Sequence, residues 1–319
     1  MNTGPGNRTL IYRISDFFQE RFGRKVYRVT VDGGFTCPNR VAEPSIPCVF
    51  CDERGSGARH IDTCATIRVQ YEDGKRRIRE RFAAEAFLPY FQSFTNTYAS
   101  TAVCLDRYRQ VLDEDAVGIA IGTRPDCLAD DLLEALGQIA GDRLVILDLG
   151  VQSMTDRVLE KVHRGHGSKE TLDALERLRR WPAIHVCLHL IFGLPTETEA
   201  EMMDSLKLFE SYPIAGLKLH QLNILEGTMM AQWYRSGLVT TLPLERYVSL
   251  VADYLERIPA HVVIHRLSAR ADNHSALLAP EWGRARLMPM QKILDELVCR
   301  GSHQGKFFGQ RKGTGSNRV

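Results

Sequence analysis

The chain has 319 residues, of which 44% are hydrophobic and 25% are charged, as expected of a globular protein large enough to bury a sizeable core. Its 41 basic and 39 acidic residues give a formal net charge of +2, so a nucleic-acid partner would need a local basic patch rather than bulk charge. Eight cysteines are too few for a disulfide scaffold, and no stretch approaches the ~20 apolar residues of a membrane span.

The amino-terminal region carries no sign of a targeting segment. Residues 1–23 lack the apolar core of about 7–15 residues found in secretion signals, so we expect a cytoplasmic protein without a membrane segment. Apolar side chains recur at steps of three and four over residues 10–22, which predicts an amphipathic helix. Gly23 provides a suitable end for that helix.

A loop with three cysteines follows a strand predicted over residues 25–32. Cys37, Cys48 and Cys51 lie among glycines and prolines, which exclude a helix or a regular strand and leave the thiols free to converge. A Cys-x-x-Cys pair with a third cysteine nearby indicates a metal site.

Two kinds of metal centre are compatible with this loop. Structural zinc needs four tetrahedral ligands, and Cys64 or His60 could supply the fourth. An iron–sulfur cluster could use the three cysteines alone and leave one iron open for a non-protein ligand. Phe50, between the last two cysteines, favours the cluster because an apolar cover protects a redox centre from water.

A helix predicted over residues 67–85 is rich in basic side chains. It carries Lys75, Arg76, Arg77, Arg79 and Arg81. The simplest interpretation is a solvated helix face, and binding of phosphates is the alternative.

Strands and helices alternate over the middle of the chain. Further strands are predicted at residues 87–94, 116–122, 144–150, 186–192 and 216–222. The segments between them have helical periodicity, and we expect Thr196 and Glu199 to cap the helix after the fifth strand. Together with the strand at residues 25–32, these units predict an α/β fold with a parallel sheet covered by helices, either barrel-like or doubly wound.

Polar or turn-forming residues stand at the carboxyl ends of the predicted strands. In parallel α/β sheets these ends meet at one edge, where active sites are built. The cysteine loop leaves the first strand, and the others are followed by Thr95-Asn96, Thr123-Arg124, Gln152-Ser153, Gly193-Leu194-Pro195 and His220-Gln221. The sequence therefore predicts a site formed jointly by six strand ends.

The last part of the chain predicts a mixed carboxyl-terminal extension over residues 228–305. It contains helical segments and a strand at residues 262–265. Residues 306–319 are rich in glycine, serine and basic residues, and we expect a flexible basic tail there. An amino-terminal helix over residues 1–24 and a core over residues 25–227 complete the predicted organisation.

The motifs of this chain, taken together, resemble those of a known enzyme superfamily. The stretches VYRVTVDGGFTCPNR, CVFCDERGSG, IGTRPDCL, HLIFGLP and KLHQLNILEGT are similar, in order, to those of the radical S-adenosylmethionine (radical SAM) enzymes. Within that superfamily they resemble a bacterial subgroup akin to the Elongator catalytic subunit and MiaB. Matching stretches extend from about residue 26 to residue 282, so the resemblance covers most of the chain.

This resemblance implies a partial (β/α)6 TIM-like barrel with a mixed carboxyl-terminal extension. It also implies a [4Fe–4S] cluster bound by Cys37, Cys48 and Cys51, with S-adenosylmethionine (SAM) chelating the fourth iron through its amino and carboxylate groups. An electron from the cluster would cleave SAM to a 5′-deoxyadenosyl radical, which abstracts hydrogen from the substrate. An electron donor such as flavodoxin or ferredoxin is implied as a partner.

The resemblance also implies cofactor contacts along the strand ends. Thr95 and Asn96 stand where such enzymes hold the amino-acid end of SAM, and Arg164 suits its carboxylate. Asp148 and Gln152 suit the ribose and methionyl groups. The other implied contacts are an apolar one from Phe50, backbone approach to the adenine at Gly193 and Leu194, a cavity-lining Thr123, and a substrate contact from Arg124.

The substrate is indicated by the resemblance alone. Similarity to the Elongator subunit implies a tRNA with a uridine at the wobble position, and the lack of a second cysteine trio argues against MiaB-type sulfur insertion. Two other functions remain open: a radical enzyme acting on a small metabolite, and a zinc-stabilised nucleic-acid-binding module without catalysis. Binding of tRNA at moderate salt and the identity of the bound metal distinguish them. The sequence does not indicate the oligomeric state.

Overall fold

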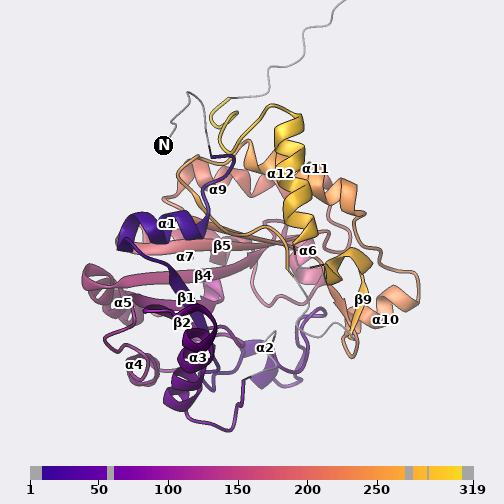
Figure 1. Cartoon of the computed structure of the whole chain (residues 1–319). Coiled ribbons are helices and arrows are strands. Elements are labelled where there is room, and N and C mark those ends of the chain that lie inside the picture. Colours follow the sequence, from indigo (N-terminus) through magenta and orange to yellow (C-terminus); the bar gives the residue numbers. More distant parts are fainter. Residues whose placement is uncertain (1–8, 56–60, 270–275, 286, 311–319) are drawn as a thin grey trace, which may run out of the picture.

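The computed structural model describes residues 9–55, 61–269, 276–285 and 287–310. Its centre is a seven-stranded sheet in which all neighbouring strands are parallel, in the order β1-β2-β3-β4-β5-β6-β8 (Figure 1). The strands are β1 Val26–Val31, β2 Ala86–Phe91, β3 Gly118–Thr123, β4 Leu144–Gln152, β5 Ile184–Phe192, β6 Gly216–Gln221 and β8 Val263–Arg266. This arrangement confirms the predicted α/β fold and adds a seventh strand to the six of the predicted core.

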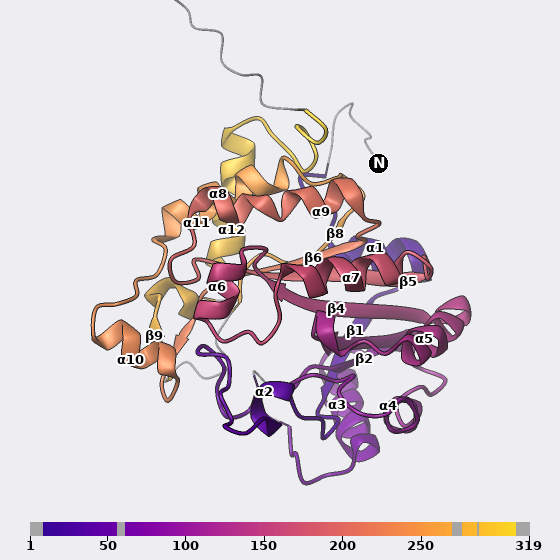
Figure 2. The ribbon, with the colours of Figure 1, turned by 180° about the vertical axis from the view of Figure 1, so that it is seen from behind.

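Helices cover the outside of this sheet, with α5 and α7 lying across the strands when the molecule is seen from behind (Figure 2). The longer helices are α1 Ile14–Phe22, α3 Ile67–Phe82, α4 Thr101–Arg109, α5 Asp130–Asp142, α7 Ser168–Leu178, α11 Leu244–Leu255 and α12 Met288–Cys299. The shorter ones are α2 Pro38–Val41, α6 Asp156–Lys161, α8 Glu199–Asp204, α9 Leu206–Ser211 and α10 Met229–Arg235. A small antiparallel pair, β7 Ile224–Leu225 and β9 Leu277–Ala279, lies apart from the main sheet.

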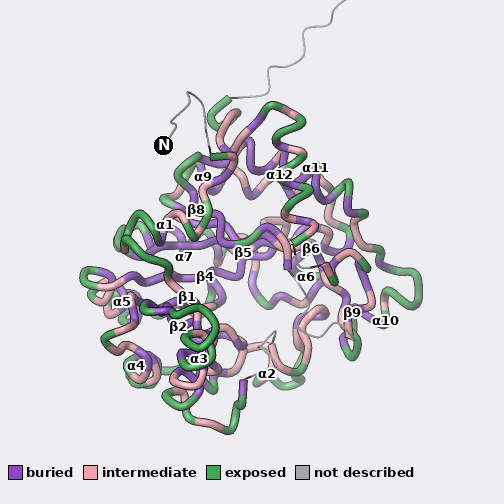
Figure 3. Tube along the Cα trace, in the orientation of Figure 1, coloured by how far each residue is buried: buried purple, intermediate pink, exposed green. Residues whose placement is uncertain are grey.

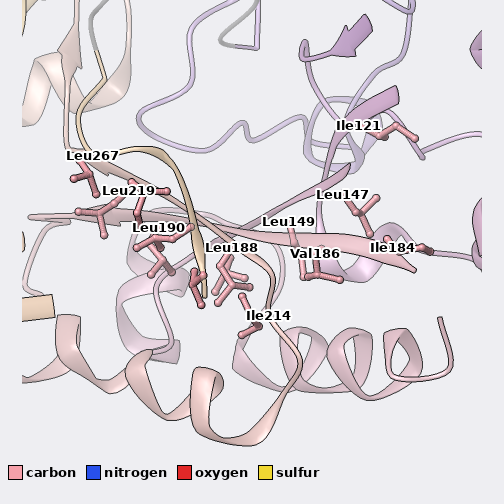
Figure 4. Close-up of a cluster of buried hydrophobic side chains, with 14 of the residues drawn as sticks. Ile121, Leu147, Leu149, Ile184, Val186, Leu188, Leu190, Ile214, Leu219 and Leu267 are labelled. Atoms are coloured by element: carbon pink, nitrogen blue, oxygen red, sulfur yellow. The ribbon is translucent and has the colours of Figure 1, made fainter. Parts of the chain in front are cut away.

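The sheet is buried on both faces. Every residue of β4 is buried, whereas the outward sides of the surrounding helices are exposed (Figure 3). Leu147, Val186, Leu188 and Leu219 belong to the main hydrophobic core and are among the side chains drawn in Figure 4. Because side chains alternate along a strand, the residues between these positions face the inside of the barrel.

The sheet curls until its two edge strands meet. Arg28 of β1 donates from Nη2 to Nδ1 of His265 of β8 at 2.9 Å. Strand β8 comes from the predicted carboxyl-terminal extension, so this extension contributes directly to the partial barrel.

Helix α1 closes the amino-terminal end of the barrel. Phe18 packs with the inward-facing Leu88 and Leu144 in a small apolar cluster. The residue ahead of the helix, Arg13, forms a parallel bridge with Ile264 of β8. The barrel is therefore filled with apolar side chains at this end, and its free space lies toward the carboxyl ends of the strands.

One predicted helix start is wrong. The capping box at the start of α8 is formed by Thr198 and Glu201, two residues later than the predicted pair Thr196 and Glu199. Thr196 has a φ of +68° and lies in the preceding turn, so it cannot begin a helix.

The prediction of a flexible tail is also wrong for residues 306–310. The Phe307 N–H donates to the carbonyl of Glu256 at 2.7 Å, and Lys306 Nζ donates to the carbonyl of Gly301 at 2.9 Å. Just before this segment, buried Gln304 donates to the carbonyl of Val262 at 2.8 Å. The remainder of the predicted tail lies outside the described residues.

The basic helix α3 presents a solvated face, as its simplest interpretation predicted, because Arg76, Arg77, Arg79 and Arg81 are exposed. Lys75 is the exception: it is buried and forms ion pairs with Asp113 and Asp115. Arg79 is also paired with Asp115. Across the described part of the chain, no helix combines the length and apolarity that crossing a bilayer requires.

Candidate active site

A cavity of about 920 Å³ extends from the cysteine loop into the barrel. All three predicted cysteine ligands line it, together with inward-facing residues from each of the seven strands. These residues are Thr30, Tyr90, Thr123, Asp148, Gln152, His189, Lys218, His220, His265 and Arg266. The cavity therefore joins the cysteine loop to the interior of the barrel, as the strand-end polar residues predicted.

The cysteine loop is anchored by two backbone hydrogen bonds and by one apolar side chain. The Val49 N–H donates to the carbonyl of Val162 at 3.1 Å, and the Val49 carbonyl accepts from the N–H of Met230 at 2.8 Å. The Val49 side chain is buried in an apolar cluster that also contains Leu194 and Leu222. These contacts hold the Cys48–Cys51 segment against the ends of the later strands.

Each of the three cysteines receives a donor from a different arginine. Arg124 Nη1 lies 3.5 Å from Cys37 Sγ, Arg164 Nη1 lies 3.8 Å from Cys48 Sγ, and Arg40 Nη2 lies 3.6 Å from Cys51 Sγ. The Asn39 side-chain amide adds a donor at 3.6 Å from Cys48 Sγ. Donors of this kind stabilise thiolates and metal-bound sulfur, so the environment favours a charged sulfur centre.

The spacing of the cysteines does not fit zinc. Among the described residues, Asp148, Cys187 and His265 are the only three whose potential ligand atoms all lie within 4.8 Å of one another. The sulfurs of the cysteine loop are thus more widely spread than the ~3.8 Å that tetrahedral bonds of ~2.3 Å would require. An iron–sulfur cluster fits better because each cysteine binds a different iron.

One of the predicted fourth zinc ligands, Cys64, is exposed and does not line the cavity. The other, His60, lies outside the described residues. Burial raises the pKa of the Cys51 thiol to about 11, while the hydrogen bond from Arg40 acts in the opposite direction. Binding of a metal centre would therefore release a proton from this thiol.

Most of the predicted cofactor residues line the same cavity. They are Phe50, Thr95, Thr123, Asp148, Gln152 and Arg164. Gln152 has a φ of +70°, and its buried Oε1 has no hydrogen-bond partner among the described residues. An unusual backbone angle together with an unpaired buried oxygen indicates a side chain held ready for a ligand.

Three of the predicted cofactor residues do not line the cavity. Asn96 is fully buried, and its amide donates to the carbonyls of Phe91 at 3.2 Å and Gly122 at 2.9 Å, which joins the ends of β2 and β3. Leu194 is buried in the apolar cluster around Val49, and Gly193 precedes it with a φ of +86° that favours glycine. Their predicted contacts with SAM stay untested, and the buried Asn96 Oδ1, like Gln152 Oε1, has no hydrogen-bond partner among the described residues.

The two arginines given ligand roles from the sequence have protein partners, and their predicted contacts with substrate and SAM stay untested. The buried Arg164 Nε has no hydrogen-bond partner among the described residues. Arg124 is buried, forms a two-point contact with Asp126 at 2.8 and 2.6 Å, and donates to Asn39 at 2.6 Å. Arg164 is also buried, and its Nη2 donates to the carbonyl of Gly150 at 2.6 Å. Their contacts with cysteine sulfur indicate a role beside the metal centre. A substrate contact from Arg124 stays an untested prediction.

A buried ion pair forms the floor of the cavity. Lys218 Nζ donates to Asp148 Oδ2 at 2.7 Å and to the Tyr90 hydroxyl at 2.6 Å. Burial alone would raise the pKa of Asp148, but the Lys218 ammonium and the neighbouring His265 hold it well below its usual range. This ammonium also disfavours a cation at the Asp148–Cys187–His265 group, because like charges repel.

Sequence reasoning missed several polar residues of the cavity. Asn39 and Arg40 follow Cys37 after a single proline, and only the folded loop reveals their contacts with sulfur. His189 in β5 and Lys218 in β6 are polar residues among apolar ones. Each stands between apolar residues that face the other side of the sheet, because side chains alternate along a strand. That alternation was a usable signal for a polar barrel interior.

Comparison with known proteins agrees with this geometry. The Radical SAM superfamily profile matches residues 34–209, and the Radical_SAM C-terminal domain profile matches residues 214–298. The uncharacterized protein YtqA of Bacillus subtilis is 36% identical over 311 residues, which cover 96% of this chain and 94% of that protein. The tRNA uridine(34) acetyltransferase of Dehalococcoides mccartyi is 31% identical over 154 residues, which cover 47% of this chain and 33% of that enzyme.

A solved structure shares the fold. The Elp3 protein of the archaeon Methanocaldococcus infernus, with an amino-terminal deletion, matches with a TM-score of 0.62 at 15% identity, over 88% of this chain and 64% of that chain. The profile over residues 34–209, the relative that matches nearly end to end, and a cysteine loop opening into a partial barrel all agree. The chain is an enzyme of the radical SAM superfamily.

Proposed function

We propose that this radical SAM enzyme modifies tRNA and acts on a uridine at the wobble position. The observation that carries the proposal is the cavity, in which three converging cysteines share about 920 Å³ with polar side chains from all seven strands. The name of one relative, tRNA uridine(34) acetyltransferase, supports uridine as the target.

The metal centre and SAM have a suitable place in this cavity. Cys37, Cys48 and Cys51 would hold the [4Fe–4S] cluster that the family implies, with SAM on its open iron. When bound, the two cofactors supply the 5′-deoxyadenosyl radical that takes hydrogen from the substrate. The chain itself would contribute hydrogen-bond donors to the three sulfurs. Phe50 lines the cavity beside the cysteine loop.

A folded tRNA is too large for this cavity, so a single nucleotide must leave its stack and enter alone. Single-stranded loops allow this, because their unpaired bases can be splayed outward and read along their edges. The floor offers hydrogen-bonding groups at Tyr90, Lys218 and His220 for such a base. Burial lowers the pKa of His220 well below its usual range, so its ring is neutral and can donate or accept.

The direct test uses anaerobically reconstituted protein, SAM, a reductant and an unmodified tRNA transcript. We expect formation of 5′-deoxyadenosine that depends on the tRNA, together with a mass change in one uridine nucleoside after digestion. The Cys48→Ala variant should give neither product. Formation of 5′-deoxyadenosine that is indifferent to tRNA and stimulated by a metabolite extract would contradict the RNA proposal.

The second candidate is a radical enzyme that acts on a small metabolite. The cavity is compatible with it, because polar side chains that line the barrel interior suit a small molecule as well as a single nucleotide. The same assay separates the two candidates by the molecule that stimulates SAM cleavage.

A further inference from the structure

Among the described residues, five arginines line the cavity, and they fall into two groups. Arg40, Arg124 and Arg164 each donate toward one cysteine sulfur. Arg13 and Arg266 also line the cavity but are exposed, and neither is within ion-pair distance of a carboxylate of the described residues. Within the part of the chain that the structure describes, these two cationic side chains at the rim therefore have no carboxylate partner.

These two arginines come together from distant parts of the sequence. Arg13 forms a parallel bridge with Ile264, and the N–H of Ile264 donates to the carbonyl of Tyr12 at 2.7 Å. Arg266 follows two residues later along β8, so both arginines lie where the amino-terminal segment meets the edge of the sheet. Ser15, at the start of α1, lines the cavity at the same place.

The acidic residues nearest to this rim already have partners. Asp148 is paired with Lys218 at 2.7 Å, and Glu226 in the cavity wall is paired with Arg235. The carboxylate of Asp16 on α1 accepts the backbone N–H of Arg13 at 3.2 Å. The positive charge of the rim is thus available to an incoming anion.

The basic helix singled out in the sequence lies elsewhere. Lys75 and Arg79 on α3 are paired with Asp113 and Asp115. None of the basic residues of α3 lines the cavity.

We infer that Arg13 and Arg266 form a phosphate-binding rim, which holds the phosphodiester next to the nucleotide that enters the cavity. This inference rests on the proposed function and names the part of the RNA that the rim binds. A guanidinium binds two phosphate oxygens at once, so two arginines at an opening suit a phosphodiester. With the base inside the barrel, its flanking phosphate remains at the opening, where the exposed arginines lie.

The test measures the affinity of the reconstituted protein for an RNA anticodon stem-loop with uridine at the wobble position, over a series of salt concentrations. Each of Arg13→Gln and Arg266→Gln is expected to weaken binding several-fold and to reduce the slope of log K against log salt by about 0.7, the value for one phosphate of a single strand. Arg109→Gln is the matched control, because Arg109 is exposed and lies outside the cavity. It should leave both quantities unchanged. Circular dichroism checks that each variant is folded.

The outcomes separate the rim from the proposed function. If the wild type binds the stem-loop and both rim variants have the same affinity and salt slope, the two arginines do not bind phosphate and the proposed function stands. If the wild type does not bind RNA at low salt, the proposed function fails, and the rim is tested with uridine 5′-monophosphate against uridine. If the wild type binds the monophosphate more tightly than uridine and the rim variants do not, the two arginines bind the phosphate of a small substrate. Equal binding of both compounds would overturn the inference.

Discussion

At the scale of single residues, the most informative feature is the set of donors around the three cysteines. Arg40, Arg124 and Arg164 come from three different segments, and each approaches a different sulfur. Hydrogen bonds to cluster sulfur stabilise its more negative, reduced form. These arginines would therefore ease the reduction of a cluster held by the three cysteines without binding metal themselves.

We predict that Arg40→Gln lowers the reduction potential of the cluster by roughly 60 mV, equivalent to ~1.4 kcal/mol for one electron, which is at the lower end of a charge-assisted hydrogen bond. Arg40 is the best choice of the three, because Arg124 and Arg164 are deeply buried and their loss would disturb packing. A redox titration followed by EPR measures the potential. Arg109→Gln serves as the control, and an unchanged potential in Arg40→Gln protein with full iron content would contradict the role.

The sequence predicts the cysteines but not their surroundings. Cys37, Cys48 and Cys51 share one loop, so spacing alone brings them together. Arg124 and Arg164 instead reach the loop from beyond β3 and β4, and only the curled sheet determines which atoms they meet. Their predicted roles toward substrate and SAM suit strand-end cations, and in the structure they contact cysteine sulfur, Asp126 and a backbone carbonyl.

At the scale of elements, the turn between β5 and α8 shows the limit of local signals. The sequence contains two overlapping Thr-x-x-Glu patterns, starting at Thr196 and at Thr198. Both satisfy the rule for a capping box equally well. The structure selects the second, since Arg157 pairs with Glu201 at 2.8 Å and Arg246 pairs with Glu199. Tertiary contacts decide between local alternatives that the sequence cannot rank.

The same turn contains a carboxyl group that links two strand-end loops. Ser153, after β4, donates its hydroxyl to Glu197, after β5, and the other carboxylate oxygen of Glu197 has no partner among the described residues. Burial raises the pKa of Glu197 to about 7. Folding therefore favours the protonated form, and ionisation of Glu197 costs stability as pH rises from about 4.5 to about 7.

We predict that Glu197→Gln stabilises the protein at about pH 8 by ~1–2 kcal/mol, after allowance for solvent screening, and by only ~0.4 kcal/mol near pH 4.5, where the wild-type carboxyl is protonated in the folded state and about half ionised in the unfolded state. Urea denaturation midpoints at the two pH values measure the difference. The exposed Glu210→Gln variant should show no such dependence. An equal effect of Glu197→Gln at both pH values would refute the raised pKa.

At the scale of the whole molecule, the half-barrel has one end filled with apolar side chains and an opposite end that holds the cavity and the cysteine loop. Phe18 of α1 helps to fill the amino-terminal end, and the cysteine loop stands at the carboxyl ends of the strands. The alternation of strands and helices predicted this arrangement. The closure by β8 was not predicted, because the contact between Arg28 and His265 joins residues far apart in the chain.

The central claim is that Cys37, Cys48 and Cys51 hold a cluster that cleaves SAM, and that Cys64 takes no part. The most direct measurement combines iron content, EPR of the reduced protein with and without SAM, and 5′-deoxyadenosine formation, for the wild type, Cys48→Ala and Cys64→Ala. We predict about four irons per chain, a spectrum that changes with SAM, and cleavage in the wild type and Cys64→Ala, with loss of all three in Cys48→Ala. Zinc without iron in the wild type, or loss of the cluster in Cys64→Ala, would contradict the claim.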